Sequence, residues 1–352
     1  MADLAIEVEG LGKTFLPSSR MLRFLLRTQI QQKVVALEQV TFTVPVGGLC
    51  VVAGQNGAGK STLFRSLVGL VVPTAGAASV LGLDVIDHAR EVRAVIGYMA
   101  SDDRTLWLRL SCLENVGFHA RLRGVPPVEH HARVAEALRS VGLADVADRS
   151  GFALSGGMRA RLQLACALVG RPSVLILDEP TSALDPVAAY ELASLVRSLA
   201  EEEGIAVLIS THRVDEIEAF GTRLLLLHRG HLLHDGPVEE LTQAERPVID
   251  LRFHEVERAD WARARLSAMP HMSVSGNAYE VSVVSVSSVG QVLAVLEGHL
   301  EDLRSVTERR PPLRDVLSQV LANVESVQEV AAGEAIDASP VGDDERVSRR
   351  EP

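Results

Sequence analysis

One segment limits the fold of this chain more than any other feature. The segment GQNGAGKST, residues 54–62, directly follows an apolar run at 49–53 and is itself followed by leucines at helical spacing. This is the pattern G-x-x-x-x-G-K-[ST] in a strand, loop and helix setting. Glycines let the backbone bend closely around an anion so that successive N–H groups point inward, and the helix start adds its dipole. The segment therefore predicts a site for the phosphates of a nucleoside triphosphate.

Two residues of this segment carry specific chemistry. Lys60 would neutralise the β- and γ-phosphates, and the Ser61 hydroxyl would be a ligand of Mg²⁺. A glycine-rich turn that matches by chance is the alternative, and the strand and helix on either side argue against it. The other predicted contacts with the nucleotide come from Gly54, Gln55, Asn56, Gly57, Ala58, Gly59 and Thr62.

The apolar runs of the chain predict its fold class. Between residues 6 and 235, short apolar runs such as 174–177, 206–210 and 224–227 alternate with stretches of helical periodicity. Continuous apolar strands separated by helices indicate a mainly parallel sheet that is covered on both faces. We therefore expect an α/β fold of the P-loop NTPase type, into which a helix-rich segment at about 106–154 is inserted.

A second domain is expected after Gly236 and Pro237. There the pattern changes to short strands and helices, which predict a small α+β appendage over residues 237–324. The expected strands are 248–253, two within 272–286, and 303–307, and the expected helices are 256–268, 289–300 and 313–324. Residues 325–352 are rich in acidic residues, glycine and proline, and are expected to form a disordered tail.

Three later segments narrow the kind of nucleotide-binding protein. The apolar run VLILDEP ends in Asp178 and Glu179, where one carboxylate can hold the Mg²⁺ shell and the next can polarise an attacking water. LSGGM at 154–158 lies before it, and SALD at 182–185 and His212 lie after it. Taken singly, these residues could be a solvated strand end, a capped helix start and a surface histidine. Their joint occurrence after a phosphate loop argues against those explanations.

This combination resembles the nucleotide-binding subunit of ABC transporters. The resemblance covers residues 4–236 in the family's motif order, with LSGGM as the signature motif, SALD as the D-loop and His212 as the switch histidine. Phe15 takes the place of the aromatic residue that stacks on adenine. The resemblance implies ATP and Mg²⁺ as ligands. It also implies an ATPase domain over residues 1–236, with a RecA-like core, an antiparallel β subdomain and a helical subdomain at about 106–154.

The resemblance also implies a dimer. Two such domains close head to tail, and each ATP lies between one subunit's phosphate loop and Ser155, Gly156 and Gly157 of the other. Backbone N–H groups at that helix start suit the γ-phosphate. Asp185 would couple the two sites. A homodimer is permitted because this one chain carries both a catalytic carboxylate and an intact signature motif.

The catalytic roles are implied in the same way. Glu179 would act as the general base and His212 would contact the γ-phosphate, with Lys60 beside them. Asp178 and Ser61 would hold Mg²⁺.

Three positions depart from the commonest pattern of the family. Gln55 replaces a usual proline, which should be harmless because its side chain faces outward, and Met158 ends the signature motif where glutamine is usual. Ser101 stands where the Q-loop glutamine is expected, and Asp102 and Asp103 follow it. A serine hydroxyl could still reach Mg²⁺ through a bridging water. The alternative is that Ser101 only turns the chain and caps.

Several features resemble ABC exporters of the type-two class, in which a separate multi-span membrane protein partners the ATPase subunit. They are the variant loop, the pattern at Arg104–Leu110, the run LSGGMRARL and the C-terminal appendage. An insert at residues 17–33 can form a basic amphipathic helix, which contacts either the inner leaflet or the partner, or packs on the domain's own sheet. Trp107 either lines the groove for the partner's coupling helix or belongs to the core of the helical insertion.

The charge and hydropathy of the chain agree with this expectation. Its 352 residues carry a formal net charge of −11, which argues against a nucleic-acid partner because phosphate binding favours a basic surface. We find no run of about 20 predominantly apolar residues that would span a bilayer, and no signal-peptide pattern. We expect a cytoplasmic protein, peripheral on the inner face of the cell membrane through its permease subunit. Cys50, Cys112 and Cys166 are expected to be buried, reduced thiols.

A different function is the alternative to transport. Some soluble ABC-type ATPases act on ribosomes or DNA, and those usually have two cassettes in one chain, or long coiled-coil or basic inserts. This chain has one cassette and neither kind of insert. The cargo of a transporter of this class is selected largely by the membrane subunit.

Overall fold

The computed structural model divides the chain into two compact units, Met1–Val238 and Glu239–Pro352. The structure describes residues 4–17, 33–101, 105–221, 223–244, 247–269, 272–285, 289–322 and 324. Most of the expected basic amphipathic insert, residues 18–32, and the expected tail, residues 325–352, lie outside the described residues.

A six-stranded, mainly parallel sheet forms the centre of the first unit, as the apolar runs predict. Every residue of its central strands β7 and β8 is buried, which explains why these runs are continuously apolar rather than alternating. Among the described strands of this sheet, β9 and β10 at one edge pair antiparallel and the other neighbours pair parallel. In sheet order the strands are β10 (His231–Pro237), β9 (Arg223–His228), β3 (Leu49–Ala53), β8 (Ala206–Thr211), β7 (Val174–Asp178) and β6 (Ile96–Met99).

A second, antiparallel sheet completes the core of this unit. Its strands β1 and β2 carry both buried and exposed positions, and their buried side chains join one hydrophobic core with β3 and with Phe64 of the helix that follows the phosphate loop. This is the antiparallel β subdomain that the resemblance implies. In sheet order the strands are β2 (Val34–Pro45), β1 (Leu4–Phe15), β4 (Ala75–Val80) and β5 (Leu83–Asp84).

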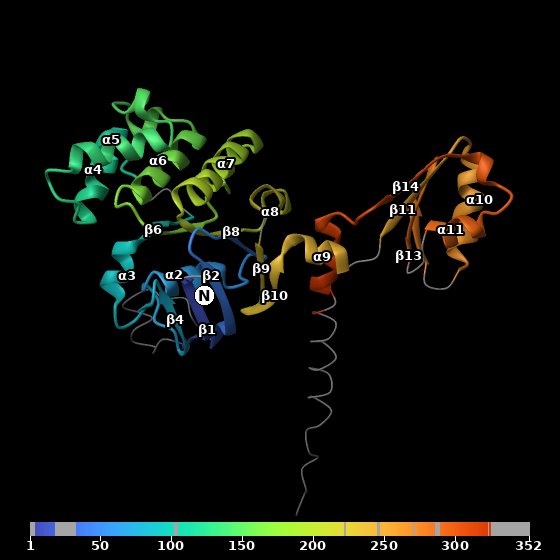
Figure 1. Ribbon diagram of the computed structural model, residues 1–352, viewed down its shortest axis with the longest axis horizontal. Helices are drawn as coiled ribbons and strands as arrows, with labels where there is room; N and C mark the ends of the chain where they lie inside the picture. The colour runs from blue at the N-terminus through green and yellow to red at the C-terminus, as the bar shows by residue number, and fades with distance from the viewer. Residues whose placement is uncertain are drawn as a thin grey trace, which may run out of the picture. The chain divides into compact units, whose positions relative to one another are not determined.

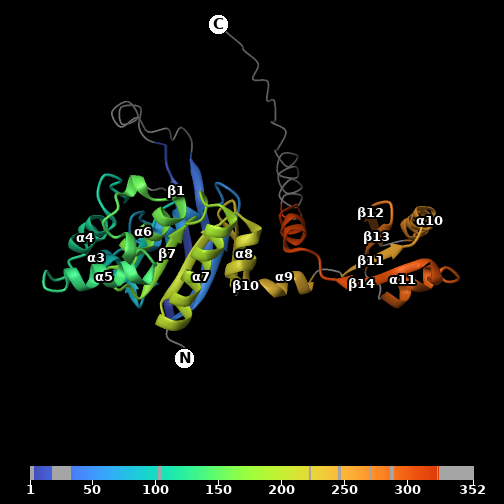
Figure 2. The same ribbon diagram turned by 90° about the horizontal axis from the view of Figure 1, so that it is seen from above.

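Helices pack around the parallel sheet and also form the predicted insertion. Figure 1 shows α4, α5 and α6 grouped on one side of the unit, away from β1 and β2, and Figure 2 shows α7 between that group and α8. Ser111 and Glu114 form a capping box that starts α4. The helices are α2 (Lys60–Leu67), α3 (Ala89–Val95), α4 (Cys112–Leu122), α5 (His130–Ser140), α6 (Gly156–Leu168), α7 (Pro186–Glu203) and α8 (Val214–Phe220), with short 3₁₀ turns at Ala144–Val146 and Gly151–Ala153. A further helix, α9 (Val238–Ala244), begins at the last residue of this unit.

The second unit is an α+β fold with the element order βαββαβ. Its four strands form one antiparallel sheet in the order β12-β13-β11-β14, the arrangement of a split βαβ or ferredoxin-like motif. The helices α10 and α11 share a core with Ile249, Leu251 and Phe253 on one face of β11. The elements are β11 (Val248–Phe253), α10 (Val256–Ser267), β12 (Met272–Gly276), β13 (Glu280–Ser285), α11 (Val289–Val295), a 3₁₀ turn at Leu300–Asp302, β14 (Leu303–Arg309) and a helix over 313–322.

One predicted element of this unit is too long. The helix expected over 289–300 ends at Val295, and a turn follows in which Gly298 has a φ of +88°. A left-handed residue of this kind commonly ends a helix, and glycine adopts it without steric cost.

The three cysteines are free and buried, as expected. Burial raises the pKa of the Cys50 thiol and of the Cys166 thiol to about 12, so both stay protonated at neutral pH. Among the described residues, no helix is both long enough and apolar enough to cross a bilayer.

Candidate nucleotide-binding site

The phosphate loop joins β3 to α2, and its glycines are required by close backbone contacts. A Cβ on Gly54 would lie 2.3 Å from the carbonyl oxygen of Leu227, and one on Gly59 would lie 2.5 Å from that of Ala36. Gly57 and Gly59 have φ values of +84° and +110°, which side chains with a Cβ rarely adopt. The sequence pattern therefore produces a tight loop at the carboxyl end of a central strand.

Lys60 is held inside this loop. Its side chain is only 5% exposed, and its ammonium donates to the carbonyl oxygens of Gly54 and Gln55 at 2.7 and 3.2 Å. The same nitrogen lies 3.2 Å from Oε1 of Glu179. A buried ammonium with acceptors only on the loop and on one carboxylate is positioned to meet a phosphate that enters the loop.

The two predicted carboxylates lie at the end of β7, next to β8 in the sheet. Asp178 is buried, and its Oδ1 accepts a hydrogen bond of 2.7 Å from the hydroxyl of Ser210 on β8. The Ser210 hydroxyl in turn accepts one of 2.9 Å from the backbone N–H of Glu179. Ser210 therefore fixes both carboxylate-bearing residues to the neighbouring strand.

His212 follows β8 and contacts the carboxylate oxygen of Glu179 that Lys60 does not. Its Nδ1 lies 3.3 Å from Oε2 of Glu179, and the histidine side chain is 40% exposed. Glu179 has a φ of +49°, an uncommon conformation for a residue with a side chain, which is found at turns and at functional sites. The structure thus brings Lys60, Asp178, Glu179 and His212 together at one edge of the sheet.

Phe15 lies at the end of β1, beside the loop. It pairs with Val34, two residues before Ala36, and the carbonyl of Ala36 is the one that approaches Gly59. The ammonium of Lys13 lies 5.0 Å from the centroid of the Phe15 ring. The half-buried ring is therefore near the loop, and its contact with adenine stays a prediction.

The signature motif and the D-loop are packed against each other. Ser155 caps α6, which begins with Gly156 and Gly157, and Asp185 caps α7. A Cβ on Gly157 would lie 3.0 Å from the Cβ of Ala188 in α7. Among the described residues, no hydrogen bond or ion pair joins this pair of helix starts to the phosphate loop of the same chain. Their predicted contacts with ATP across a dimer stay predictions.

Ser101 lies two residues beyond the end of β6 and is exposed. Because β6 pairs with β7, Ser101 lies at the same edge of the sheet as Asp178. No hydrogen bond within the described part of the chain joins it to Asp178 or Ser61, so its role with Mg²⁺ stays a prediction.

Comparison with known proteins places this site in a family. The family model described as "ABC transporter" matches residues 37–182. The methionine import ATP-binding protein MetN of Corynebacterium diphtheriae is 33% identical over 257 residues, which cover 72% of this chain and 72% of that protein. This chain belongs to the ABC transporter family of ATP-binding proteins.

Two further relatives show how far the likeness to other ABC cassettes extends. The "Probable multidrug ABC transporter ATP-binding protein YbhF" of Escherichia coli is 38% identical over 231 residues, which cover 65% of this chain but only 39% of that protein. A dimeric post-hydrolysis structure of the ATP-binding cassette MJ0796, bound to ADP and Pi, has a TM-score of 0.56 at 25% identity, covering 66% of this chain and 98% of that one. ABC cassettes are ATPases coupled to transport, and this chain is such an ATPase.

The residues of this ABC cassette fit both ATP and a divalent cation. Oδ2 of Asp178 is buried and accepts no hydrogen bond within the described part of the chain. A buried carboxylate oxygen without a donor is costly unless a cation is near it. Ser61 stands in the first turn of α2, directly after Lys60. These two side chains would hold Mg²⁺, and the loop and Lys60 would hold the phosphates.

Sequence reasoning missed one buried residue of the cassette, which contacts both neighbours of His212 in the sequence. Glu216 is on α8 and only 4% exposed. Its Oε2 accepts a hydrogen bond from the hydroxyl of Thr211, and its Oε1 lies 3.4 Å from Nε of Arg213. The Thr211 hydroxyl also accepts from the backbone N–H of Arg213 at 3.0 Å. Glu216 therefore contacts the residues on both sides of His212, and we expect it to position His212. The sequence feature that could have identified Glu216 is its position, four residues after His212.

We expect Glu216→Ala to lower kcat for ATP hydrolysis by about 10–100-fold, because supporting partners of a site have effects of that size, and to change KM for ATP little. Steady-state phosphate release measures both constants. Glu216→Gln, which can still accept from Thr211, should lose less activity. The matched control is Glu218→Ala, an exposed position on the same helix, which should behave as the unchanged chain.

A double-mutant cycle separates positioning from general stability. Once His212 is replaced by alanine, Glu216→Ala should cause little additional loss of kcat. A full additional loss in that background would contradict the positioning role.

Proposed function

We propose that this chain is the ATP-hydrolysing motor of an ABC exporter, working as a dimer on a separate membrane subunit at the inner face of the cell membrane. One observation carries the catalytic part of the proposal. Glu179 lies between Lys60 and His212, within 3.3 Å of each, at the carboxyl ends of β3, β7 and β8.

Hydrolysis needs a base beside the terminal phosphate and positive charge to balance that phosphate. The Glu179 carboxylate can polarise the attacking water and hold its proton. Lys60, which now donates to carbonyls of its own loop, would donate to phosphate oxygens, and His212 would contact the γ-phosphate from the neighbouring strand. Bound Mg²⁺ would neutralise charge on the phosphates, held by Asp178 and Ser61. The geometry supports each of these roles.

The dimer is the next part of the proposal. Within one chain, Ser155 and Asp185 cap their own helices and do not contact the described phosphate loop. The N–H groups at the start of α6 are suited to a γ-phosphate that a second copy presents. The dimeric structure of MJ0796 supports this arrangement by analogy, because that cassette aligns over 98% of its own length.

Glu179→Gln tests the base and the dimer together. The amide cannot take a proton from water, so we expect ATP turnover to fall by about 100-fold or more while ATP binding persists. With Mg²⁺ and ATP the variant should elute as a nucleotide-loaded dimer in size-exclusion chromatography. Glu202→Gln, at an exposed position of α7, is the control. Undiminished turnover in Glu179→Gln would rule out the role as base.

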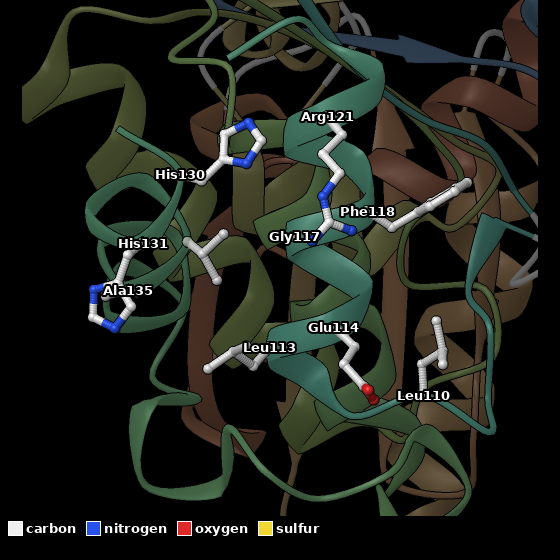
Figure 3. Close-up of a pocket in the computed structure, with 10 residues that line it drawn as sticks. Leu110, Leu113, Glu114, Gly117, Phe118, Arg121, His130, His131 and Ala135 are labelled. Atoms are coloured by element: carbon white, nitrogen blue, oxygen red, sulfur yellow. The ribbon is translucent and has the colours of Figure 1, made fainter. Parts of the chain in front are cut away.

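A groove on the helical subdomain is the proposed contact for the membrane subunit. It has a volume of about 400 Å³ and lies between α4 and α5. Figure 3 shows Leu113 and Phe118 on α4 and His131 on α5 around it. Leu113 is 43% exposed, and the Trp107 ring, 58% exposed, contacts Phe118 edge to face. Exposed apolar side chains around a hollow suit an amphipathic helix of a partner. Trp107 is thus not a core residue of the insertion.

Leu113→Asp should weaken capture of that partner because a charge would enter the apolar contact. We expect the tagged chain to retain a multi-span membrane protein from detergent-solubilised membranes of its own cells, and the variant to retain about tenfold less. Val128→Asp, at a 92% exposed position outside the groove lining, is the control. Recovery of ribosomes or DNA instead would favour the soluble alternative.

The direction of transport, outward, is the most specific part of this proposal. The 38% identical multidrug relative supports it, as do the serine in the Q-loop position and the appendage after the cassette. The methionine importer among the relatives shows that family membership alone leaves the direction open. Inside-out membrane vesicles that contain the chain and its partner should accumulate the dye Hoechst 33342 when ATP is added. Uptake of the dye only in right-side-out vesicles that have been loaded with ATP would reverse the direction.

A further inference from the structure

The last strand of the second unit, β14, forms one edge of its sheet. Within the described residues, β14 pairs only with β11, and its other edge faces no strand. The positions from Arg304 to Arg309 are all exposed, including Val306 at 37%. An edge strand of this kind offers a row of backbone donors and acceptors to another strand.

The sequence of β14 is self-complementary about Val306. If two copies of the segment RSVTE, residues 304–308, pair antiparallel with Val306 opposite Val306, then Arg304 of each lies opposite Glu308 of the other. Ser305 then lies opposite Thr307. Opposite charges and Ser–Thr pairs directly across an antiparallel ladder are both favourable.

The register of β14 places Val306 and Glu308 on one face. Val306 is opposite Leu251 and Glu308 is opposite Ile249, so both point to the face that α10 and α11 cover. Leu303, directly before Arg304, packs against the core of that same face, so the regular alternation of the strand is broken at Arg304. The ladder is regular from Ser305 to Arg309 and shifts at Arg304, so the pairing segment begins at that residue.

We propose that two copies of this chain associate through β14, in a two-fold symmetric pairing that joins their sheets into one. We infer a second copy of this chain as the partner because the charges of β14 are complementary to those of an antiparallel copy of the same strand. A two-fold symmetric contact requires this kind of self-complementarity. This contact needs no nucleotide, so it goes beyond the ATP-dependent closure of the cassettes. It also raises the effective concentration of one cassette near the other.

The opposite edge of the same sheet lacks this property. The edge strand β12, with the sequence MSVSG, has no charged side chain, and its Gly276 has a φ of +141°. The alternative for β14 is that Arg304 and Glu308 protect the edge against pairing, which charged side chains do in many sheets. That alternative predicts a monomer without nucleotide.

Charge reversal distinguishes the two cases. Sedimentation of the full chain without nucleotide or Mg²⁺ should show a dimer. Arg304→Glu creates carboxylate pairs across the two-fold axis and Glu308→Arg creates guanidinium pairs, so each should raise the dimer Kd by about tenfold or more. Ser275→Glu, on the β12 edge, is the control and should leave the Kd unchanged.

Mixing the two variants is the decisive step. An Arg304→Glu chain and a Glu308→Arg chain present complementary charges to each other, so the mixture should form heterodimers. The double variant R304E/E308R should recover the homodimer. Any one of three results would overturn the proposal: the unmodified chain is a monomer, the single variants have an unchanged dimer Kd, or the mixture of the two variants has a Kd no lower than that of either variant alone. If the β14 contact fails these tests while the Glu179→Gln chain still forms its ATP-loaded dimer, the proposed closure of the cassettes is unaffected.

Cross-linking tests the register. Opposite residues in an antiparallel pair have Cα atoms about 4.5–5.5 Å apart, which a disulfide can bridge. Val306→Cys should therefore cross-link to its own copy under mild oxidation, since the native cysteines are buried. Ser275→Cys should not. Equal cross-linking at both positions would contradict pairing through β14.

Discussion

The carboxylate of Glu179 is the interaction on which the site depends. One of its oxygens meets Lys60 of the phosphate loop and the other meets His212. The three residues follow β7, β3 and β8, and these strands are neighbours in the sheet order β3-β8-β7. A parallel sheet brings the carboxyl ends of its strands to one edge, so the sheet order itself brings these three side chains together.

The second layer of contacts orients this group. Ser210 joins β8 to Asp178 and to the backbone of Glu179, and the other Asp178 oxygen accepts no hydrogen bond from the described residues. Glu216 holds the residues on either side of His212. Side chains that are already held in place by hydrogen bonds need little reorganisation when charge develops in the transition state. This preorganisation is the main source of electrostatic catalysis.

Local patterns were sufficient to predict much of this structure. The strands at 49–53, 174–178 and 206–211 are continuous apolar runs, and the phosphate loop is a contiguous motif, so both can be recognised without tertiary contacts. The sequence could not show that Ser210 reaches Asp178, because 32 positions separate them, nor that Glu216 is buried. The length of α11 and the exposed edge at β14 also depend on packing and sheet order rather than on periodicity.

The central claim is that Lys60, in its loop, and the carboxylates after β7 form one ATP-hydrolysing site. The most direct test is Mg²⁺-dependent phosphate release from ATP by the purified chain and by Lys60→Ala, with folding checked by circular dichroism. The account predicts turnover that requires Mg²⁺ and falls by about 100-fold or more in the folded variant, because the lysine balances charge on the transferred phosphate. Equal turnover in Lys60→Ala, or turnover indifferent to Mg²⁺, would contradict it.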